Sequence, residues 1–404
     1  MGGVKQVLFG DVNFRPKEDA RSVVSIKSRP WRVCVLLILA FFAFFTPAWF
    51  PKATGQIAPR QNDLIAQASA ARMQNDIPRA IELYSRAVQA NPKWPDGWWF
   101  LGSLQYGTGA YVPARDALSH YIELIPKGGP AFALRGLCEF ETGEYTQALG
   151  DIQHGISLGA ANEARNEQIL RYHEALLQTR LGNYTSALKM YSIFAKNGIT
   201  NPELIAAIGL AGLRMPLLPK DVGMEQQSLV SATGDAAYRF LAGDEASAAR
   251  AFQELFQRFP TTPNVHFLYG YLLFATDPDA ALPEFQQELK IAPANADADV
   301  MTAWGLLLHN SGAEALPYAQ RAAEQKPALP SAQLVLGRSL METGDLKEGM
   351  LHLERARQIE PNNLEVHLAL ATAYSKSGRK EDARCERILS LQLSSSKGAT
   401  PDHP

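Results

Sequence analysis

A 34-residue period runs through most of this 404-residue chain and restricts the folds open to it. Ala80, Ala114 and Ala148 are spaced by 34, and so are Pro327 and Pro361. Self-similarity at a fixed period of this size is typical of stacked repeats, each of which is one supersecondary unit. A proline at a fixed phase ends a helix in each repeat, because its ring cannot continue the helix. The period therefore predicts an array of stacked repeats that contain helices.

The residues at this period also carry a family pattern. One unit has W-x2-L-G beginning at Trp98, A-x3-L beginning at Ala114, and then Pro126, although Gln105 stands where the pattern has Tyr. This unit resembles the tetratricopeptide repeat (TPR), whose signature is W-x2-L-G-x2-Y, then A-x3-F, then P. The resemblance implies an all-α solenoid of helix hairpins. In it, small residues such as Gly102 let two helices approach, and large side chains at the A-x3-F positions fill the space between hairpins.

The phases predict about nine repeats. They fall at about 61–94, 95–128, 129–162, 168–201, 229–262, 263–295, 296–329, 330–363 and 364–392. Five extra residues lie near AANEARNEQ, between the third and fourth repeats. The prediction groups the repeats into a first array at 61–201 and a second array at 229–392.

The two predicted arrays are separated by residues 202–228, which hold one apolar helix-like run followed by RMPLLPKDV. Pro216 and Pro219 exclude a regular second helix there, so we expect a degenerate repeat that acts as a hinge. The alternative is a diverged repeat in an array that continues straight. The last helix is rich in charge and suits a solvated cap, and residues 393–404 are expected to be disordered.

An uncharged apolar run at 33–51 precedes the repeats. Its 19 residues span roughly 28 Å as a helix, which is just enough for a bilayer core. Seven Lys or Arg residues lie before it, so residues 1–32 are predicted to be a basic cytoplasmic tail, with 33–51 as a transmembrane helix or signal anchor. Residues 52–60 would be a linker, and the TPR domain would be periplasmic or extracytoplasmic. The alternatives are a protein secreted after signal cleavage, or a buried core helix.

The charge balance and the motifs exclude several function classes. Lys and Arg number 39 against 41 Asp and Glu, and the basic surplus is confined to the N-terminal segment, so nucleic-acid binding is not expected. The eight histidines stand at no metal-ligand spacing, and no catalytic or phosphate-binding motif is present. We therefore expect no enzyme, catalytic residue, metal, cofactor or small-molecule substrate. His266 and His367 occupy the phase of Trp98, which favours helix packing over metal ligation.

In the TPR family, the first helix of each repeat lines the concave surface. The corresponding phases place nine aromatic residues in a predicted partner-binding groove: Trp99, Tyr106, Phe140, Tyr172, Phe240, Phe267, Tyr271, Phe274 and Trp304. Exposed aromatic surface of this kind marks interaction sites. The alternative is that these rings pack in the core. Arg180, Arg338 and Lys376 are isolated cations at the groove phases, so a clamp for acidic chaperone C-termini is not expected.

These features predict a membrane-anchored protein–protein interaction scaffold that binds a protein or peptide segment in its concave groove. The stretch PNVHFLYGYLLF resembles bacterial membrane-anchored TPR proteins of unassigned activity. One alternative is an envelope-assembly or secretion accessory factor that handles client polypeptides. Another is an anchor subunit of an enzyme complex.

Overall fold

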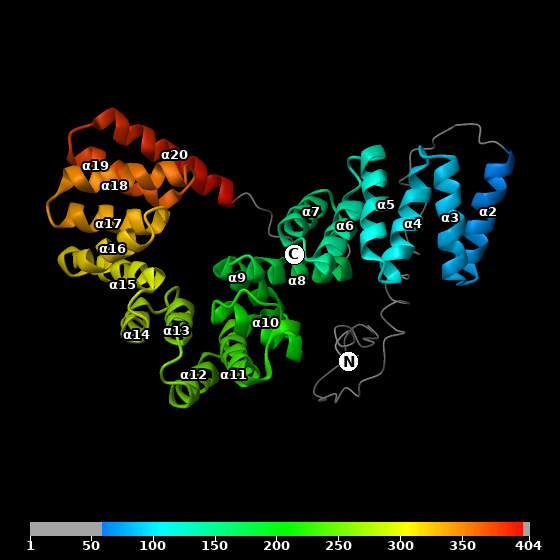
Figure 1. Cartoon of the computed structure of the whole chain (residues 1–404). Coiled ribbons are helices and arrows are strands. Elements are labelled where there is room, and N and C mark those ends of the chain that lie inside the picture. The colour runs from blue at the N-terminus through cyan, green and yellow to red at the C-terminus, as the bar shows by residue number, and fades with distance from the viewer. Residues whose placement is uncertain (1–58, 163, 399–404) are drawn as a thin grey trace, which may run out of the picture. The chain divides into compact units, whose positions relative to one another are not determined.

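The computed structural model describes residues 59–162 and 164–398, which fold into helices α2–α20 and one 3₁₀ turn, with no strand in that part of the chain (Figure 1). The predicted tail 1–32 and the predicted membrane segment 33–51 lie outside the described residues, as does most of the linker 52–60. Within the described part, no helix is both long and apolar enough to cross a membrane. Two compact units divide the chain after Gly234, within α11.

The first unit contains four helix pairs and one additional helix. Its helices are α2 (Pro59–Met73), α3 (Ile77–Ala90), α4 (Pro95–Gly107), α5 (Tyr111–Leu124), α6 (Gly129–Thr142), α7 (Tyr145–Ser157), α8 (Ala164–Arg180), α9 (Tyr184–Lys196) and α10 (Pro202–Gly212). The 3₁₀ turn η2 (Pro219–Asp221) and helix α11 (Met224–Leu241) follow. The four pairs coincide with the four repeats predicted between residues 61 and 201.

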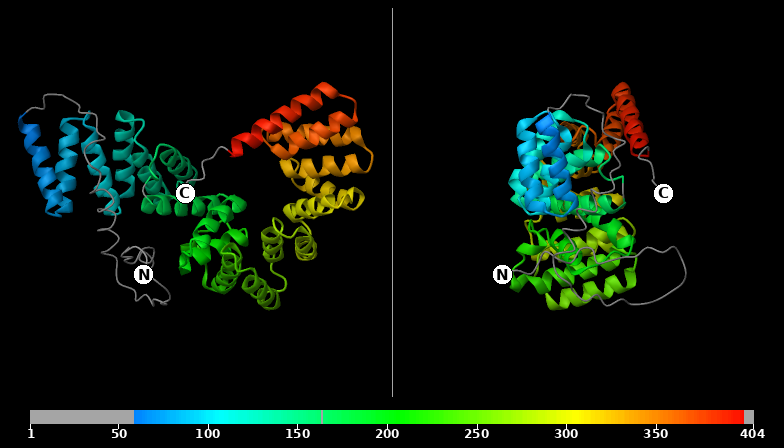
Figure 2. Two further views of the ribbon diagram at one scale, coloured as in Figure 1. Left: turned by 180° about the vertical axis from the view of Figure 1, so that it is seen from behind. Right: turned by 90° about the vertical axis from the view of Figure 1, so that its right-hand side faces the viewer.

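The second unit contains the remaining helices. They are α12 (Glu245–Arg258), α13 (Val265–Leu273), α14 (Pro278–Ile291), α15 (Ala296–Leu308), α16 (Gly312–Gln325), α17 (Pro330–Glu342), α18 (Leu346–Ile359), α19 (Leu364–Lys376) and α20 (Lys380–Gly398). Pairs α13–α14 to α19–α20 match the last four predicted repeats. Figure 2 shows the helices of each unit stacked in chain order from two further sides.

The repeat residues have the packing roles that the TPR pattern implies. A Cβ atom on Gly136 would lie 2.9 Å from the carbonyl oxygen of Ala148, and one on Gly337 would lie 2.7 Å from Leu353 Cγ. These distances are too short for a larger residue, so glycine sets the close approach of α6 to α7 and of α17 to α18. Large side chains at the A-x3-F positions are fully buried: Tyr84, Leu118, Ile152, Tyr191, Phe252 and Phe285. Both parts of the packing prediction are confirmed.

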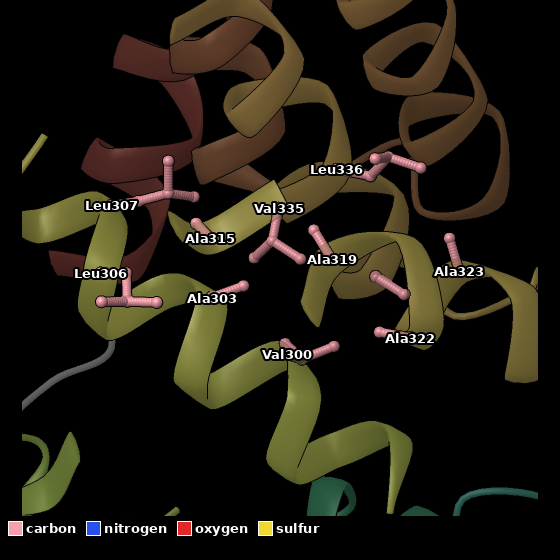
Figure 3. Packing of buried hydrophobic residues seen from close by; sticks show 11 residues of the cluster. Val300, Ala303, Leu306, Leu307, Ala315, Ala319, Ala322, Ala323, Val335 and Leu336 are labelled. Atoms are coloured by element: carbon pink, nitrogen blue, oxygen red, sulfur yellow. The ribbon is translucent and has the colours of Figure 1, made fainter. Parts of the chain in front are cut away.

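The core is built between neighbouring repeats. Figure 3 shows one cluster in which Val300 and Ala303 of α15, Ala319 of α16 and Val335 of α17 lie together. Residues Ala303, Ala319 and Val335 are fully buried. Because this cluster joins one hairpin to the first helix of the next, burial on stacking stabilises each hairpin.

The predicted degenerate repeat contains one helix where a hairpin would have two. Helix α10 ends at Gly212, and the stretch up to α11 holds only the 3₁₀ turn, as the two prolines require. Helix α10 instead crosses α11 closely. A Cβ on Gly209 would lie 2.0 Å from the Val230 carbonyl oxygen, and one on Gly234 would lie 1.9 Å from that of Ile205. Whether residues 202–228 act as a hinge stays a prediction.

Two predicted boundaries differ from the structure. Helix α8 begins at Ala164, four residues before the predicted start, and is 17 residues long, so the insertion lengthens this helix. Helix α20 continues to Gly398, which corrects the expectation that disorder begins at residue 393. The expected solvated cap is also incomplete, because Ile388, Leu389 and Leu391 are exposed on α20. Periodicity fixes the phase of a repeat, but it does not fix how far a terminal helix continues.

The first helices of neighbouring repeats contact one another. Helix α4 touches α6 and α6 touches α8 in the first unit; α15 touches α17 and α17 touches α19 in the second. A stack bends toward the side on which neighbouring elements lie closer together. The first helices therefore form the inner face of each array, which is the face on which the groove residues were predicted.

Candidate functional site

Four of the nine predicted groove residues are buried. Trp99, Phe140, Tyr172 and Phe267 expose only 6–7% of their surface. For these four, the structure favours core packing and corrects the prediction that they line an open groove.

The buried rings are covered by other rings. Trp99 lies 5.6 Å from Tyr121, measured between ring centroids, and Tyr172 lies 6.2 Å from Phe194. Phe140 meets the His173 ring edge-on at 5.0 Å. In addition, Lys220 of the 3₁₀ turn lies 5.8 Å from the Phe140 ring. Aromatic pairs at these separations stabilise a core beyond their buried area, so these phases serve packing between repeats.

The other five predicted groove residues are half-buried: Tyr106, Phe240, Tyr271, Phe274 and Trp304. Tyr106 contacts Tyr111 edge-on, and Phe274 lies 6.0 Å from the core residue Phe285. Their remaining surface is accessible, but no geometry assigns them a ligand. Partner binding by these residues stays a prediction.

A pocket of about 280 Å³ lies on the inner face of the second unit, between α17 and α19. It is lined by Arg338, Met341, Glu342, Glu365, Leu368, Ala369, Thr372 and Lys376. Helices α17 and α19 are the first helices of two consecutive repeats, so the pocket lies on the face predicted to bind a partner. Sequence reasoning named Arg338 and Lys376 at groove phases but missed the pocket, because the two cations did not fit a known clamp.

The pocket combines charge with apolar surface. The guanidinium carbon of Arg338 lies 5.1 Å from the ring centroid of Trp304 on α15, which joins one predicted groove residue to the pocket. Leu368 exposes 44% of its surface, which is high for a leucine in a folded array. Lys376 stands in the last turn of α19, where the helix dipole favours a cation. This arrangement can hold a polypeptide that carries both an apolar and a charged group.

The phase of Trp98 has a structural role in several repeats. Trp98 Nε1 donates a hydrogen bond to the Pro92 carbonyl at 2.8 Å, and Gln333 Nε2 donates to the Pro327 carbonyl at 3.0 Å. His367 Nε2 lies 2.8 Å from the Pro361 carbonyl. The other ring nitrogen of His367, Nδ1, lies 2.5 Å from the Glu386 carboxylate.

His266 stands at the same phase and stacks on Phe256 with the ring centroids 3.9 Å apart. Its Nδ1 lies 2.6 Å from the Glu284 carboxylate. The prediction that His266 and His367 pack helices is confirmed.

A group of charges lies between α5, α6 and α7 in the first unit, in which Glu139 is buried and the other side chains are partly buried. Arg115 pairs with Glu144, and Arg135 pairs with Asp151. Glu139 lies in the same region, is 7% exposed, and has one carboxylate oxygen without a hydrogen bond. The pKa of Glu139 is raised to about 7, chiefly by burial, with Asp151 also raising it and Arg135 lowering it. Among the described residues, no three His, Cys, Asp or Glu side chains are grouped so that they could hold a metal ion.

Stacked helix hairpins with a shared inner face define a helical-repeat protein of the solenoid type. Family models described as tetratricopeptide repeat match residues 65–129, 301–363 and 344–385. The chain therefore contains tetratricopeptide repeats over these residues. Repeats of this kind support a role as a protein–protein interaction scaffold.

The chain is similar to the small glutamine-rich tetratricopeptide repeat-containing protein 2 of Mycosarcoma maydis. The two are 25% identical over 128 residues, which are 32% of this chain and 36% of that protein. The chain thus matches only about a third of the relative's length.

Among solved structures, the chain is similar to MamA residues 41 to the end from Desulfovibrio magneticus RS-1. Identity is 19%, the TM-score is 0.38, and the match covers 43% of this chain and 97% of that one. Another crystal structure of MamA protein gives 16% identity, a TM-score of 0.37, and coverage of 45% and 99%. At this level of likeness, the solved structures say nothing about the function of this chain.

Proposed function

We propose that this protein is a membrane-anchored interaction scaffold that binds a segment of a partner protein on the inner face of its second unit. The observation that carries this proposal is the pocket between α17 and α19. Exposed Leu368 lies in it beside charged side chains, on the face where the first helices of consecutive repeats meet. Partly apolar concave surfaces with a few convergent polar groups are the usual sites of ligand recognition.

The partner would bind as an extended or helical segment along α17 and α19. A segment with one large apolar side chain would cover Leu368 and Ala369, which removes apolar surface from water at about 25 cal/mol per Å². Charged side chains at the rim would select among such segments and fix their register.

Crosslinked pull-down of the full-length protein from solubilised membranes tests this site. We expect one dominant partner for the wild type, and a loss of at least tenfold in its recovery for Leu368→Glu, because the carboxylate removes the apolar contact and must be desolvated when a partner covers it. Leu351→Glu is the matched control, since Leu351 on α18 is 57% exposed and lies outside the pocket lining. Recovery that is unaffected by Leu368→Glu would contradict the proposed site. Many weak hits would favour the handling of client polypeptides.

Membrane anchoring is proposed from the apolar run at 33–51 alone. Extraction of membranes at alkaline pH should leave the full-length chain in the pellet, because an inserted helix of this length resists extraction. A variant that lacks residues 1–52 should appear in the supernatant. If the chain is expressed at full length but is recovered shortened at its N-terminus and released without detergent, that result would contradict an anchor and favour signal cleavage.

A further inference from the structure

The Arg338 guanidinium is held in place without being neutralised. Its carbon lies 5.1 Å from the Trp304 ring centroid, and Trp304 in turn packs against the core clusters on both sides of α17. Stacking of guanidinium on an indole face leaves the N–H groups at its edge free to donate hydrogen bonds. No carboxylate of residues 59–162 or 164–398 lies within 4.0 Å of an Arg338 nitrogen.

The two carboxylates of the pocket are placed at helix N-termini. A Cβ on Gly312 would lie 2.8 Å from Glu342 Oε2, so the Glu342 carboxylate sits beside the first residue of α16. Glu365 lies in the first turn of α19. The positive end of the α19 dipole stabilises the anion at Glu365, whereas Glu342 is also the last residue of α17 and lies at that helix's negative end. Neither carboxylate lies within 4.0 Å of an Arg338 nitrogen, so the guanidinium is available to a ligand.

Apolar surface lies within about one helical turn of this cation. Arg338 and Thr372 are 34 residues apart and occupy the same phase of consecutive repeats, so they are neighbours across the two helices. Leu368 lies four residues before Thr372, one turn along the same face of α19. Met341 lies three residues after Arg338 on α17. A ligand anion at Arg338 would thus have an apolar wall on either side.

From this geometry we infer that the partner segment carries an aspartate or glutamate within about four residues of a large apolar side chain. The carboxylate accepts hydrogen bonds from the Arg338 guanidinium on its Trp304 platform, and the apolar side chain lies on Leu368. The inference rests on the proposed function, which it extends by naming the ligand chemistry. It differs from a clamp built of repeated lysines, because a single stacked arginine supplies the recognition.

The test is selection from a displayed library of random 12-residue peptides on the solubilised full-length protein. Arg338→Met and Leu368→Glu would be selected in parallel. Arg384→Met is the matched control, since it removes an exposed arginine of α20 for which no partner is found among the described residues. Peptides synthesised from the wild-type selection would also be measured with Asp replaced by Asn. Circular dichroism would verify that each variant keeps its helices.

We expect peptides with an acid near a large apolar residue on the wild type and on Arg384→Met, and loss of the acid preference on Arg338→Met. The peptides with Asn should bind the wild type about ten- to a hundredfold more weakly than the parent peptides with Asp, which is the range for a hydrogen bond to a charged group. The two kinds of peptide should bind Arg338→Met equally well. Selected peptides that need Leu368 but show no acid preference would overturn the inference and leave the proposed function intact. Peptides that do not need Leu368, or no selection at all, would overturn both.

Discussion

The inner face of the first unit at α4, α6 and α8 uses its large side chains differently from the pocket between α17 and α19 in the second unit. In the first unit, Trp99, Phe140 and Tyr172 are buried beneath other rings and act as part of the stack. In the second unit, the pocket between α17 and α19 exposes Leu368 and Lys376 beside a half-buried arginine. Aromatic residues at groove phases thus mark packing between repeats in the first unit, whereas isolated charges at those phases mark open surface in the second.

The largest expected effect is the loss of stability when a buried ring of the first unit is removed. Phe140→Ala should lower the free energy of unfolding of its unit by about 3–5 kcal/mol, because it removes a buried ring and leaves a cavity. Leu368→Ala should cost less, about 1 kcal/mol, since nearly half of the Leu368 surface is already in water. Urea denaturation of both variants measures the difference. Equal losses would break the distinction between a packed face and an open one.

A second test uses the buried charges of the first unit. The pKa of Glu139 is raised to about 7 in the folded protein, against an ordinary value of 4.5. The folded state therefore holds this proton more tightly than the unfolded state, and stability should fall as pH rises from about 4.5 to 7. The loss of stability should be on the order of 3 kcal/mol, and it should be complete above about pH 8.

Glu139→Gln removes the ionisation and should make the urea midpoint of this unit less dependent on pH between 5 and 8. Glu225→Gln, at an exposed site, should leave the wild-type profile unchanged. A pH profile that is the same in Glu139→Gln and in the wild type would show that other groups control the response. In that case the burial of Glu139 would not distinguish the charges of α5–α7 from the solvated charges of the pocket.

The smallest effect on stability is expected for a residue of the pocket, Arg338. Arg338→Met should change the free energy of unfolding by less than about 1 kcal/mol, since a half-exposed cation–π contact contributes about that much. Thermal melting beside the Phe140→Ala protein measures it. A loss as large as that of Phe140→Ala would make Arg338 a structural residue, and reduced peptide binding could then not be assigned to direct contact.

The repeat architecture could be predicted in detail because the 34-residue period encodes it redundantly. Most hairpins have a small residue, a pair like A-x3-F and a terminal proline at fixed phases, so one substitution such as Gln105 for Tyr does not hide the phase. The lone helix α10 was foreseen as an irregular segment from Pro216 and Pro219. Its close crossing with α11 was not, because Gly209 and Gly234 acquire meaning only when the two helices are brought together.

The site was less predictable, for a physical reason. The phase of a residue in its helix predicts the face on which its side chain lies. On the inner face the first helices of neighbouring repeats touch, so side chains on this one face can be either buried between two helices or exposed to solvent. Phe140 and Trp304 could not be separated on this basis, although one is buried and the other half-buried. Arg338 was visible in the sequence. Its candidate role depends on the contact with the Trp304 ring, and Trp304 lies 34 positions earlier in the chain.

The hydrogen bond to the terminal proline has a consequence for how such repeats change over time. Within this one chain, an indole at Trp98, an amide at Gln333 and an imidazole at His367 all donate to the carbonyl of a proline six residues earlier. In these three repeats the position keeps an N–H donor of suitable reach in three different side chains, whereas Phe132 and Asp299 stand at the same phase without one. Comparisons that score identity treat these three residues as unrelated. A search for a donor six residues after a helix-ending proline would group them, and could recognise diverged repeats elsewhere.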